Sequence, residues 1–261
     1  MVTDSVCPKC GGTGWIIMER ANISSAVQCE CRFEGRAARV LSEAIQEIPP
    51  LYREKSFENF AVPGPENPIG RRDLTTILLA VKTFVRDFPA KTRPGLLLVG
   101  PPGAGKTHLA VAALREIAAK GFECSFWNYQ KLLNSIRAGF DPNSNSSDRE
   151  AYGEVLNAEV LLLDDLGAHR VKDWVEDTIT SVVTFRCDNQ KPLIATTNLR
   201  LPDALVPGTK PSRVSPSGIV EYDTTLAESI GPRAYSRLFE MCTIIRMPYV
   251  EDYRRRKANT I

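Results

Sequence analysis

The sequence predicts an α/β fold with a mainly parallel sheet, preceded by a small cysteine-rich module. From about residue 71, short apolar runs that suit buried strands alternate with longer stretches that suit helices, as in a doubly wound sheet. The first 33 residues are instead rich in Cys and Gly and are too short to bury a core without a staple. We therefore divide the chain into a zinc-binding module (1–33), a helical and aromatic connector (34–70) and a main domain (71–261).

In the main domain we place each expected strand or helix from the spacing of its apolar residues, and its ends where that spacing changes. The predicted strands are 96–99, 124–127, 160–163, 193–196 and 243–247, and the predicted helices are 72–88, 106–120, 129–138, 173–188 and 226–240. The stretches 141–148 and 206–218 are polar and rich in Pro, Ser or Gly, so we expect loops there. In the connector, "GRAARVLSEAIQEI" has helical spacing and the following "PP" ends it.

The amino-acid composition limits the classes of protein to which this chain can belong. A hydrophobic content of 43% and a charged content of 25% are those of a globular protein, and no apolar run approaches the ~20 residues that span a membrane. The net charge of +2 does not by itself predict a nucleic-acid partner. An odd number of cysteines together with a nucleotide-binding motif favours a reducing cytoplasm over a disulfide framework.

The stretch "GPPGAGKT" (100–107) fits the P-loop pattern G-x-x-x-x-G-K-[ST]. It follows an apolar strand and opens a helical run, which is the context that phosphate binding requires; a chance Gly/Pro turn is the alternative. Lys106 is predicted to reach the β- and γ-phosphates of ATP, and the Thr107 hydroxyl to hold Mg²⁺. The predicted nucleotide-binding residues here are Gly100, Pro101, Pro102, Gly103, Ala104, Gly105, Lys106, Thr107 and the adjoining His108.

Two further apolar strands end in polar side chains. "VLLLDDLG" places Asp164 and Asp165 at a strand end, where ligands of open α/β sheets bind. Asp164 is predicted to hold Mg²⁺, mainly through water, and Asp165 to orient or deprotonate the attacking water. "PLIATTNL" ends at Asn198, whose amide can bond both a water and a γ-phosphate oxygen. A solvated turn is the alternative for the aspartates, and an ordinary Asn turn is the alternative for Asn198.

Four cysteines lie within the first 31 residues: Cys7, Cys10, Cys29 and Cys31. Four thiolates suit tetrahedral Zn²⁺, and a closed shell of this kind leaves no open position for catalysis. The second pair has the tighter C-x-C spacing, and the residues between the pairs predict a two-stranded ribbon with a turn near "RANIS". A redox dithiol or free thiols are the alternatives.

"IPPLYREKSFENF", "GPPGAGKTHLA", "LLLDDLG", "ATTNL" and "RAYSRLFEMC" follow one another in this order between residues 48 and 242. In order and wording these motifs resemble the AAA+ ATPases of the DnaC-type helicase-loader and IstB-like transposition-helper group. The resemblance implies an ATP-hydrolysing AAA+ core without a separate lid domain, working as a nucleotide-dependent homo-oligomer. A long Pro- and Ser-rich stretch between Leu199 and Gly231 departs from the family's pattern and makes the alignment beyond it less secure.

The resemblance also implies roles for basic residues. Arg237 in "YSRL" matches the arginine finger that reaches the ATP of a neighbouring subunit, and Arg233 lies one helical turn before it. Arg254 in the C-terminal tail matches a second nucleotide-sensing arginine. Lys131 and Arg137 lie in a segment that faces DNA in this group. A solvated helix face is the alternative for Arg233, Arg237, Lys131 and Arg137, and a plain basic tail for Arg254.

Three functions are compatible with these residues. The first is an ATPase that loads or remodels a replicative helicase on single-stranded DNA, with the zinc module docking the helicase. The second is an IstB-like helper that assembles on duplex DNA and recruits a transposase. The third is a zinc-dependent adaptor whose nucleotide site acts only as a switch. We expect a cytoplasmic protein with no membrane partner, and with ATP, Mg²⁺ and Zn²⁺ as cofactors.

Overall fold

The structure is a computed structural model of the 261-residue chain. It describes residues 7–10, 13, 15–20, 23–90, 92–139, 146–168, 173–202, 212–214, 220–222, 224–250 and 253. The termini and the remaining short segments lie outside the described residues.

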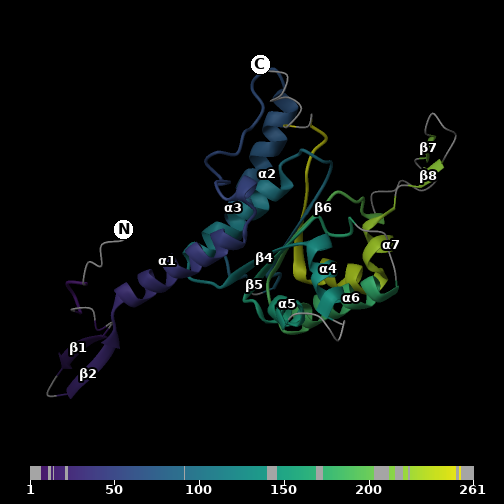
Figure 1. Cartoon of the computed structure of the whole chain (residues 1–261). Coiled ribbons are helices and arrows are strands. Elements are labelled where there is room, and N and C mark those ends of the chain that lie inside the picture. The colour runs from purple at the N-terminus through teal and green to yellow at the C-terminus, as the bar shows by residue number, and fades with distance from the viewer. Residues whose placement is uncertain are drawn as a thin grey trace.

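A five-stranded parallel sheet forms the centre of the main domain (Figure 1). Its strand order is β4-β5-β6-β3-β9, so β3 has later strands of the chain on both sides and its carboxyl end lies at a topological switch point. The strands are β3 (Gly95–Val99), β4 (Cys124–Asn128), β5 (Val160–Asp164), β6 (Leu193–Thr197) and β9 (Cys242–Arg246). The α/β fold class with a mainly parallel sheet is confirmed.

Helices cover both faces of this sheet. Alternation along β3 explains the two layers, because Leu96 and Leu98 belong to one buried cluster while Leu97 and Val99 belong to the other. Among the residues that the structure describes, three helices lie on the first face and five lie on the second. The first set is α1 (Glu30–Glu47), α2 (Pro68–Arg86) and α3 (Lys106–Ala119), and the second is α4 (Tyr129–Gly139), α5 (Ser146–Asn157), α6 (Asp173–Asp188), α7 (Leu226–Ile230) and α8 (Pro232–Met241). Within the described part of the chain, no helix is both long and apolar enough to cross a membrane.

The N-terminal region is a hairpin followed by a long helix. Strands β1 (Trp15–Arg20) and β2 (Ile23–Gln28) pair antiparallel, and α1 starts two residues after β2 ends. The C-terminal half of α1 buries Val40 and Ala44 in the hydrophobic cluster on the first face of the sheet and contacts α3 and β4. Figure 1 shows α1 running from the hairpin to the main domain, so the proposed boundary at residues 33 and 34 falls inside a continuous helix.

Three expected elements differ from the structure. The single helix predicted over 226–240 is wrong, because Gly231 has φ 83° and separates α7 from α8, which begins at Pro232. Part of the loop expected over 141–148 is helical, since α5 begins at residue 146. Within and beyond the loop expected over 206–218, β7 (Ser212–Val214) and β8 (Val220–Tyr222) form a short antiparallel pair. A small η1 turn (Pro50–Tyr52) follows α1.

A fully buried arginine holds in place the chain segments that lead into β5 and β6. Arg186 on α6 donates to the carbonyl of Val155 (2.9 Å) in the last turn of α5, to that of Ala158 (3.1 Å) just after α5, and to that of Pro192 (2.6 Å) just before β6. Burial lowers the pKa of this guanidinium to about 10. Because these carbonyls lie in the segments that lead into β5 and β6, Arg186 helps to fix the positions from which Asp164 and Asn198 emerge.

Candidate functional site

The P-loop lies between the end of β3 and the start of α3. Gly105 has φ 95°, a left-handed conformation that favours glycine, and it precedes α3 without any side-chain cap. The first N–H groups of a 14-residue helix are therefore directed into the loop, where they favour an anion. A loop of this geometry suits a phosphate group, and the roles of its individual residues stay predictions.

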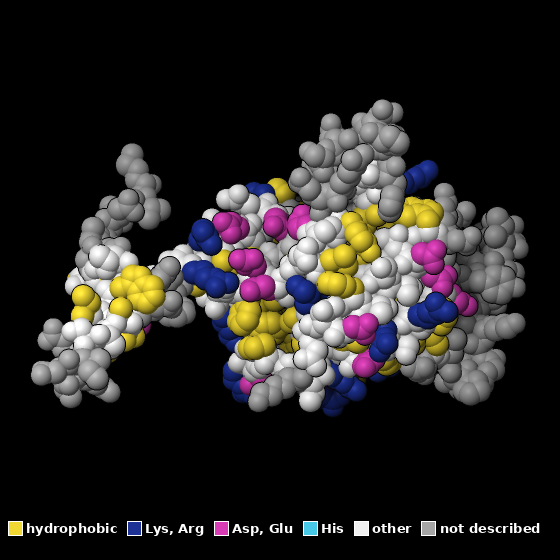
Figure 2. All heavy atoms as spheres, turned by 90° about the horizontal axis from the view of Figure 1, so that it is seen from below, with side chains coloured by type: hydrophobic (Ala, Val, Ile, Leu, Met, Phe, Trp, Pro, Cys, Tyr) yellow, Lys and Arg dark blue, Asp and Glu magenta, His cyan; other side chains and the backbone are white. Residues whose placement is uncertain are grey.

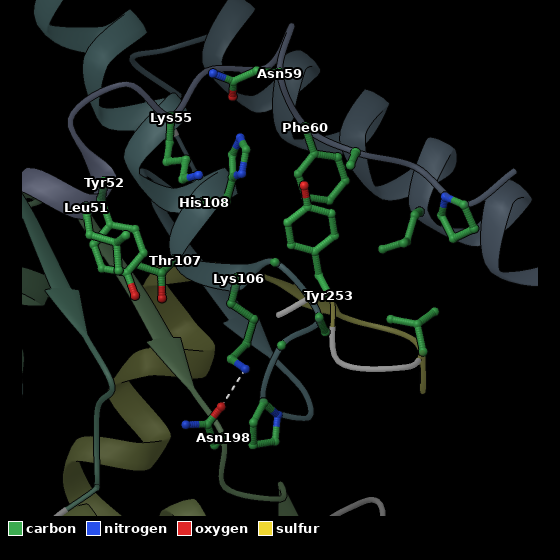
Figure 3. Close-up of a pocket in the computed structure, with 18 of the residues that line it drawn as sticks. Leu51, Tyr52, Lys55, Asn59, Phe60, Lys106, Thr107, His108, Asn198 and Tyr253 are labelled. Carbon is green, nitrogen blue, oxygen red and sulfur yellow. Dashed lines mark hydrogen bonds between the residues drawn. The ribbon is translucent and has the colours of Figure 1, made fainter. Parts of the chain in front are cut away.

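Lys106 is the buried cation of the site, with 5% of its surface exposed. Its Nζ donates to the carbonyls of Gly100 and Pro101, both at 2.8 Å, and to Asn198 Oδ1 at 2.5 Å (Figure 3). Asn198 follows β6, the strand beside β3. The structure thus brings together two residues that lie 92 positions apart in the sequence.

Asp164 connects the P-loop helix to the neighbouring strands. Its Oδ1 accepts hydrogen bonds from Thr107 Oγ1 at 3.0 Å and from Thr196 Oγ1 at 2.7 Å. Burial raises the pKa of this carboxyl above its ordinary value; the hydrogen bond from Thr196 opposes the rise and the neighbouring Asp165 carboxylate adds to it. Hydroxyl and carboxylate oxygens are ligands that Mg²⁺ prefers, so Thr107 and Asp164 fit a magnesium site.

Asp165 lies at the turn after β5 with φ 58°, a left-handed conformation that is uncommon for a residue other than glycine. Its Oδ1 accepts from Asn198 Nδ2 at 3.2 Å. A chain of hydrogen bonds therefore runs from Thr107 through Asp164, Thr196, Asp165 and Asn198 back to Lys106, and we call these six residues the polar ring. The polar ring joins the ends of three adjacent strands around the P-loop.

A cavity of about 610 Å³ opens beside the polar ring, within the size range of small-molecule sites. One wall is the P-loop with Lys106, Thr107 and His108, and Asp165 and Asn198 also line it. The opposite wall is aromatic and aliphatic, and no local sequence motif marks its side chains as part of the site. Those residues are Leu51, Tyr52, Phe60, Ala61, Pro63, Leu74, Val250 and Tyr253, several of which are labelled in Figure 3.

The aromatic wall is held in place by α3. His108 Nε2 donates to the Ser56 carbonyl at 2.8 Å, and Arg115 Nη1 donates to the Lys55 carbonyl at 2.8 Å. The Phe60 ring lies edge-on to His108, with ring centroids 5.2 Å apart, and would clash with any Cβ on Gly105. Burial lowers the pKa of His108, which suits a neutral imidazole in this contact. His108 therefore lines the cavity while its ring is bonded to the connector.

The two predicted arginines of α8 do not line this cavity. Arg233 and Arg237 border a separate surface groove between α6 and α8. Arg237 donates to Glu240 Oε2 at 2.7 Å and lies 3.8 Å from Asp188 Oδ1. A position away from the chain's own P-loop is what an arginine that serves a neighbouring subunit requires, and their roles remain predictions. Arg254 lies outside the described residues.

The four N-terminal cysteines converge at the base of the hairpin. Their Sγ atoms all lie within 4.8 Å of one another, with Cys7 to Cys29 at 3.9 Å and Cys10 to Cys31 at 3.4 Å. A compact set of four thiols fits tetrahedral Zn²⁺, which each of them would bind as a thiolate. Cys29 is the N-cap residue of α1 and Cys31 lies in its first turn, so the cluster is built directly onto this helix.

Beyond the cysteines, the hairpin carries exposed apolar side chains. Trp15, Ile17, Met18 and Val27 are each between 41% and 73% exposed, and Figure 2 shows yellow side chains on this projecting part, at the left of the view. Such side chains on a small projecting element are typical of interaction surfaces.

Comparisons with known proteins show which family the chain resembles. A family model described as IstB-like ATP-binding protein matches residues 77–204. The crystal structure of the DnaC helicase loader is similar to this chain with a TM-score of 0.58 and 30% sequence identity, and the match covers 77% of this chain and 100% of that one.

Two curated relatives extend the comparison. The Bacillus subtilis (strain 168) protein YqaM is 29% identical over 185 residues, which cover 68% of this chain and 56% of YqaM. The replicative helicase loader DnaC of Escherichia coli (strain K12) is 24% identical over 153 residues, which are 58% of each protein. The matches thus span little more than half the length of these two relatives. Together with the P-loop and the parallel sheet, the comparisons show that the chain belongs to the IstB-like and DnaC family of AAA+ ATP-binding proteins.

Proposed function

We propose that this protein is an ATPase that loads or remodels a replicative helicase on single-stranded DNA. The observation that carries the proposal is the similarity to a DnaC helicase loader over that protein's whole crystallised chain. The polar ring supports the hydrolytic step, because it gathers the cation, the two carboxylates and the amide that phosphoryl transfer to water needs. An adaptor with a simple nucleotide switch would not need all of these groups.

Each group has a distinct role in this proposal. Lys106 binds the β- and γ-phosphates, for which it gives up its contact with Asn198. Thr107 and Asp164 would hold Mg²⁺, which would supply positive charge against the phosphates. Asp165 orients the attacking water and accepts its proton, and Asn198 fixes that water against the γ-phosphate. Arg237 stabilises the developing charge on the ATP of an adjacent subunit, with Arg233 beside it.

A transposition helper on duplex DNA is the second candidate. It is favoured by the family model, whose members are IstB-like, and by a putative ATP-binding protein in an insertion sequence of Mycobacterium tuberculosis, 30% identical over 103 residues. Lys131 and Arg137 are exposed on α4 in the segment that faces DNA in this family, and they would contact phosphates in either case. The two candidates differ in the form of DNA and in the partner.

We propose that the four cysteines bind a structural Zn²⁺ and that the hairpin docks the partner protein. The exposed apolar side chains of the hairpin supply the contact surface. Since the cysteine cluster is continuous with α1, the metal would fix the hairpin relative to a helix that packs on the main domain.

The first prediction concerns catalysis. Asp165→Asn should lower the rate of ATP hydrolysis at least ~100-fold, because the water loses its base, and should leave ATP affinity within a few-fold of wild type. Phosphate release and equilibrium binding of ATP measure the two effects. Asp73→Asn, which changes a half-buried carboxylate on α2 paired with Arg72, is the matched control. Hydrolysis by Asp165→Asn at the wild-type rate would remove the catalytic assignment.

The same Asp165→Asn protein separates the two candidate partners, because it should hold ATP and accumulate assembled complexes. A helicase loader predicts ATP-dependent capture of a hexameric replicative helicase and tighter binding to single-stranded than to duplex DNA. Tighter ATP-dependent binding to duplex DNA, with no capture of the helicase, would instead establish the transposition helper.

The second prediction tests the arginine finger. Arg237→Ala should lower ATP hydrolysis by ~10³-fold or more without weakening ATP binding. Mixing it with Asp165→Asn, which keeps Arg237 but hydrolyses its own ATP only slowly, should raise the activity of the mixture, because the second subunit supplies the guanidinium. Arg39→Ala on α1 is the control for loss of an exposed arginine. Normal hydrolysis by Arg237→Ala, or no recovery in the mixture, would contradict the proposed role.

The third prediction concerns the metal. The purified protein should contain one Zn²⁺ per chain by elemental analysis, and the Cys7→Ser/Cys10→Ser variant should contain none. Cys187→Ser, outside the cluster, should keep the full content. The metal-free variant should lose partner binding and keep ATP hydrolysis, since the cysteines do not line the P-loop cavity. A wild-type protein that neither contains nor takes up Zn²⁺ would contradict this proposal.

A further inference from the structure

We infer that Thr196 is a positioning residue for ATP hydrolysis, which its hydroxyl supports by setting the orientation of both aspartates. This inference rests on the proposed ATPase activity. Thr196 is fully buried on β6, between the strand that ends in the aspartates and the strand that leads into the P-loop. It does not line the nucleotide cavity, so it would act through its neighbours.

The Thr196 hydroxyl accepts one hydrogen bond and donates another, and its partners are the two aspartates. Its oxygen accepts the backbone N–H of Asp165 at 2.9 Å, and its single proton is donated to Asp164 Oδ1 at 2.7 Å. The donation fixes one oxygen of Asp164, the same oxygen that Thr107 contacts. The hydrogen bond that it accepts fixes the orientation of the peptide group before Asp165, and with it the position of the Asp165 side chain.

The backbone of Thr196 holds the same turn. Its carbonyl accepts the N–H of Leu166 at 2.8 Å, so one residue makes three hydrogen bonds to residues 164–166. Asp165 needs this support, because its left-handed conformation persists only where the surroundings impose it. Asp165 in turn reaches Asn198 at 3.2 Å, so a shift of the turn would move both groups proposed to hold the attacking water.

Thr197 supplies a matched comparison on the same strand. It is also fully buried, and its hydroxyl also makes two hydrogen bonds, to the Leu166 carbonyl at 2.8 Å and from the Leu199 N–H at 3.1 Å. Neither partner is a carboxylate or the amide of a catalytic aspartate. Loss of the Thr197 hydroxyl therefore removes as much local bonding without releasing Asp164 or the Asp165 amide.

The test compares Thr196→Val, Thr196→Ser and Thr197→Val in the full-length chain. Valine keeps the shape and removes the hydroxyl, and serine keeps the hydroxyl. For Thr196→Val we expect kcat to fall about 10- to 100-fold, the usual loss when a supporting partner of a catalytic group is removed, with ATP affinity within about 3-fold of wild type. For Thr196→Ser and Thr197→Val we expect kcat within about 3-fold of wild type.

Two further measurements exclude a general loss of structure. Equilibrium binding of a fluorescent ATP analogue reports the integrity of the site without hydrolysis, and urea unfolding reports stability. In the Asp165→Asn background, adding Thr196→Val should lower the residual rate far less than it does in wild type, because the two changes disturb the same group.

The outcomes separate this inference from the proposed function. A wild-type protein that binds ATP and never hydrolyses it would remove both. Wild-type hydrolysis with an unchanged kcat in Thr196→Val would remove only the role of Thr196. An equal loss of kcat in Thr197→Val, or a loss that lies wholly in ATP affinity, would overturn it as well, because either result indicates general disturbance of β6.

Discussion

The site depends on a buried carboxylate that two strands and a helix share. Asp164 is 4% exposed, and its Oδ1 is bonded both to Thr107 at the start of α3 and to Thr196 on β6. A buried carboxylate is costly unless hydrogen bonds or a cation compensate it, and burial accordingly raises its pKa. This requirement ties the position of the P-loop helix to the positions of the strand ends. The other members of the polar ring are placed by the same strands.

The parallel sheet is what makes this arrangement possible. Because β5, β6 and β3 are adjacent and parallel, their carboxyl ends deliver Asp164, Asn198 and the P-loop to one edge. The connector closes the cavity from the other side, held by His108 and Arg115 of the helix that begins in the P-loop. A shift of the P-loop helix on phosphate binding would therefore also move the connector. The same connector begins with α1, at whose N-terminus the four cysteines gather.

Much of the core could be predicted because its signals are local. Runs such as "LLLV" and "VLLLDD" predict buried strands that end in functional groups, and the Cys pairs predict a metal cluster from spacing alone. What the sequence did not reveal depends on contacts between distant segments. Thr196 reads as an ordinary β-branched strand residue, and only pairing with β5 brings its hydroxyl to Asp164. Likewise, Phe60 joins the site only because the connector folds back over Gly105.

The most direct test of this account is the effect of Mg²⁺ on ATP affinity, measured by titration calorimetry on the wild type and on Asp164→Asn. We predict that Mg²⁺ strengthens ATP binding to the wild type and that this gain is lost in Asp164→Asn. Metal-free ATP should bind the variant at least as well as it binds the wild type, since one negative charge near the phosphates is gone. An undiminished gain from Mg²⁺ in Asp164→Asn would contradict the central place given to this carboxylate.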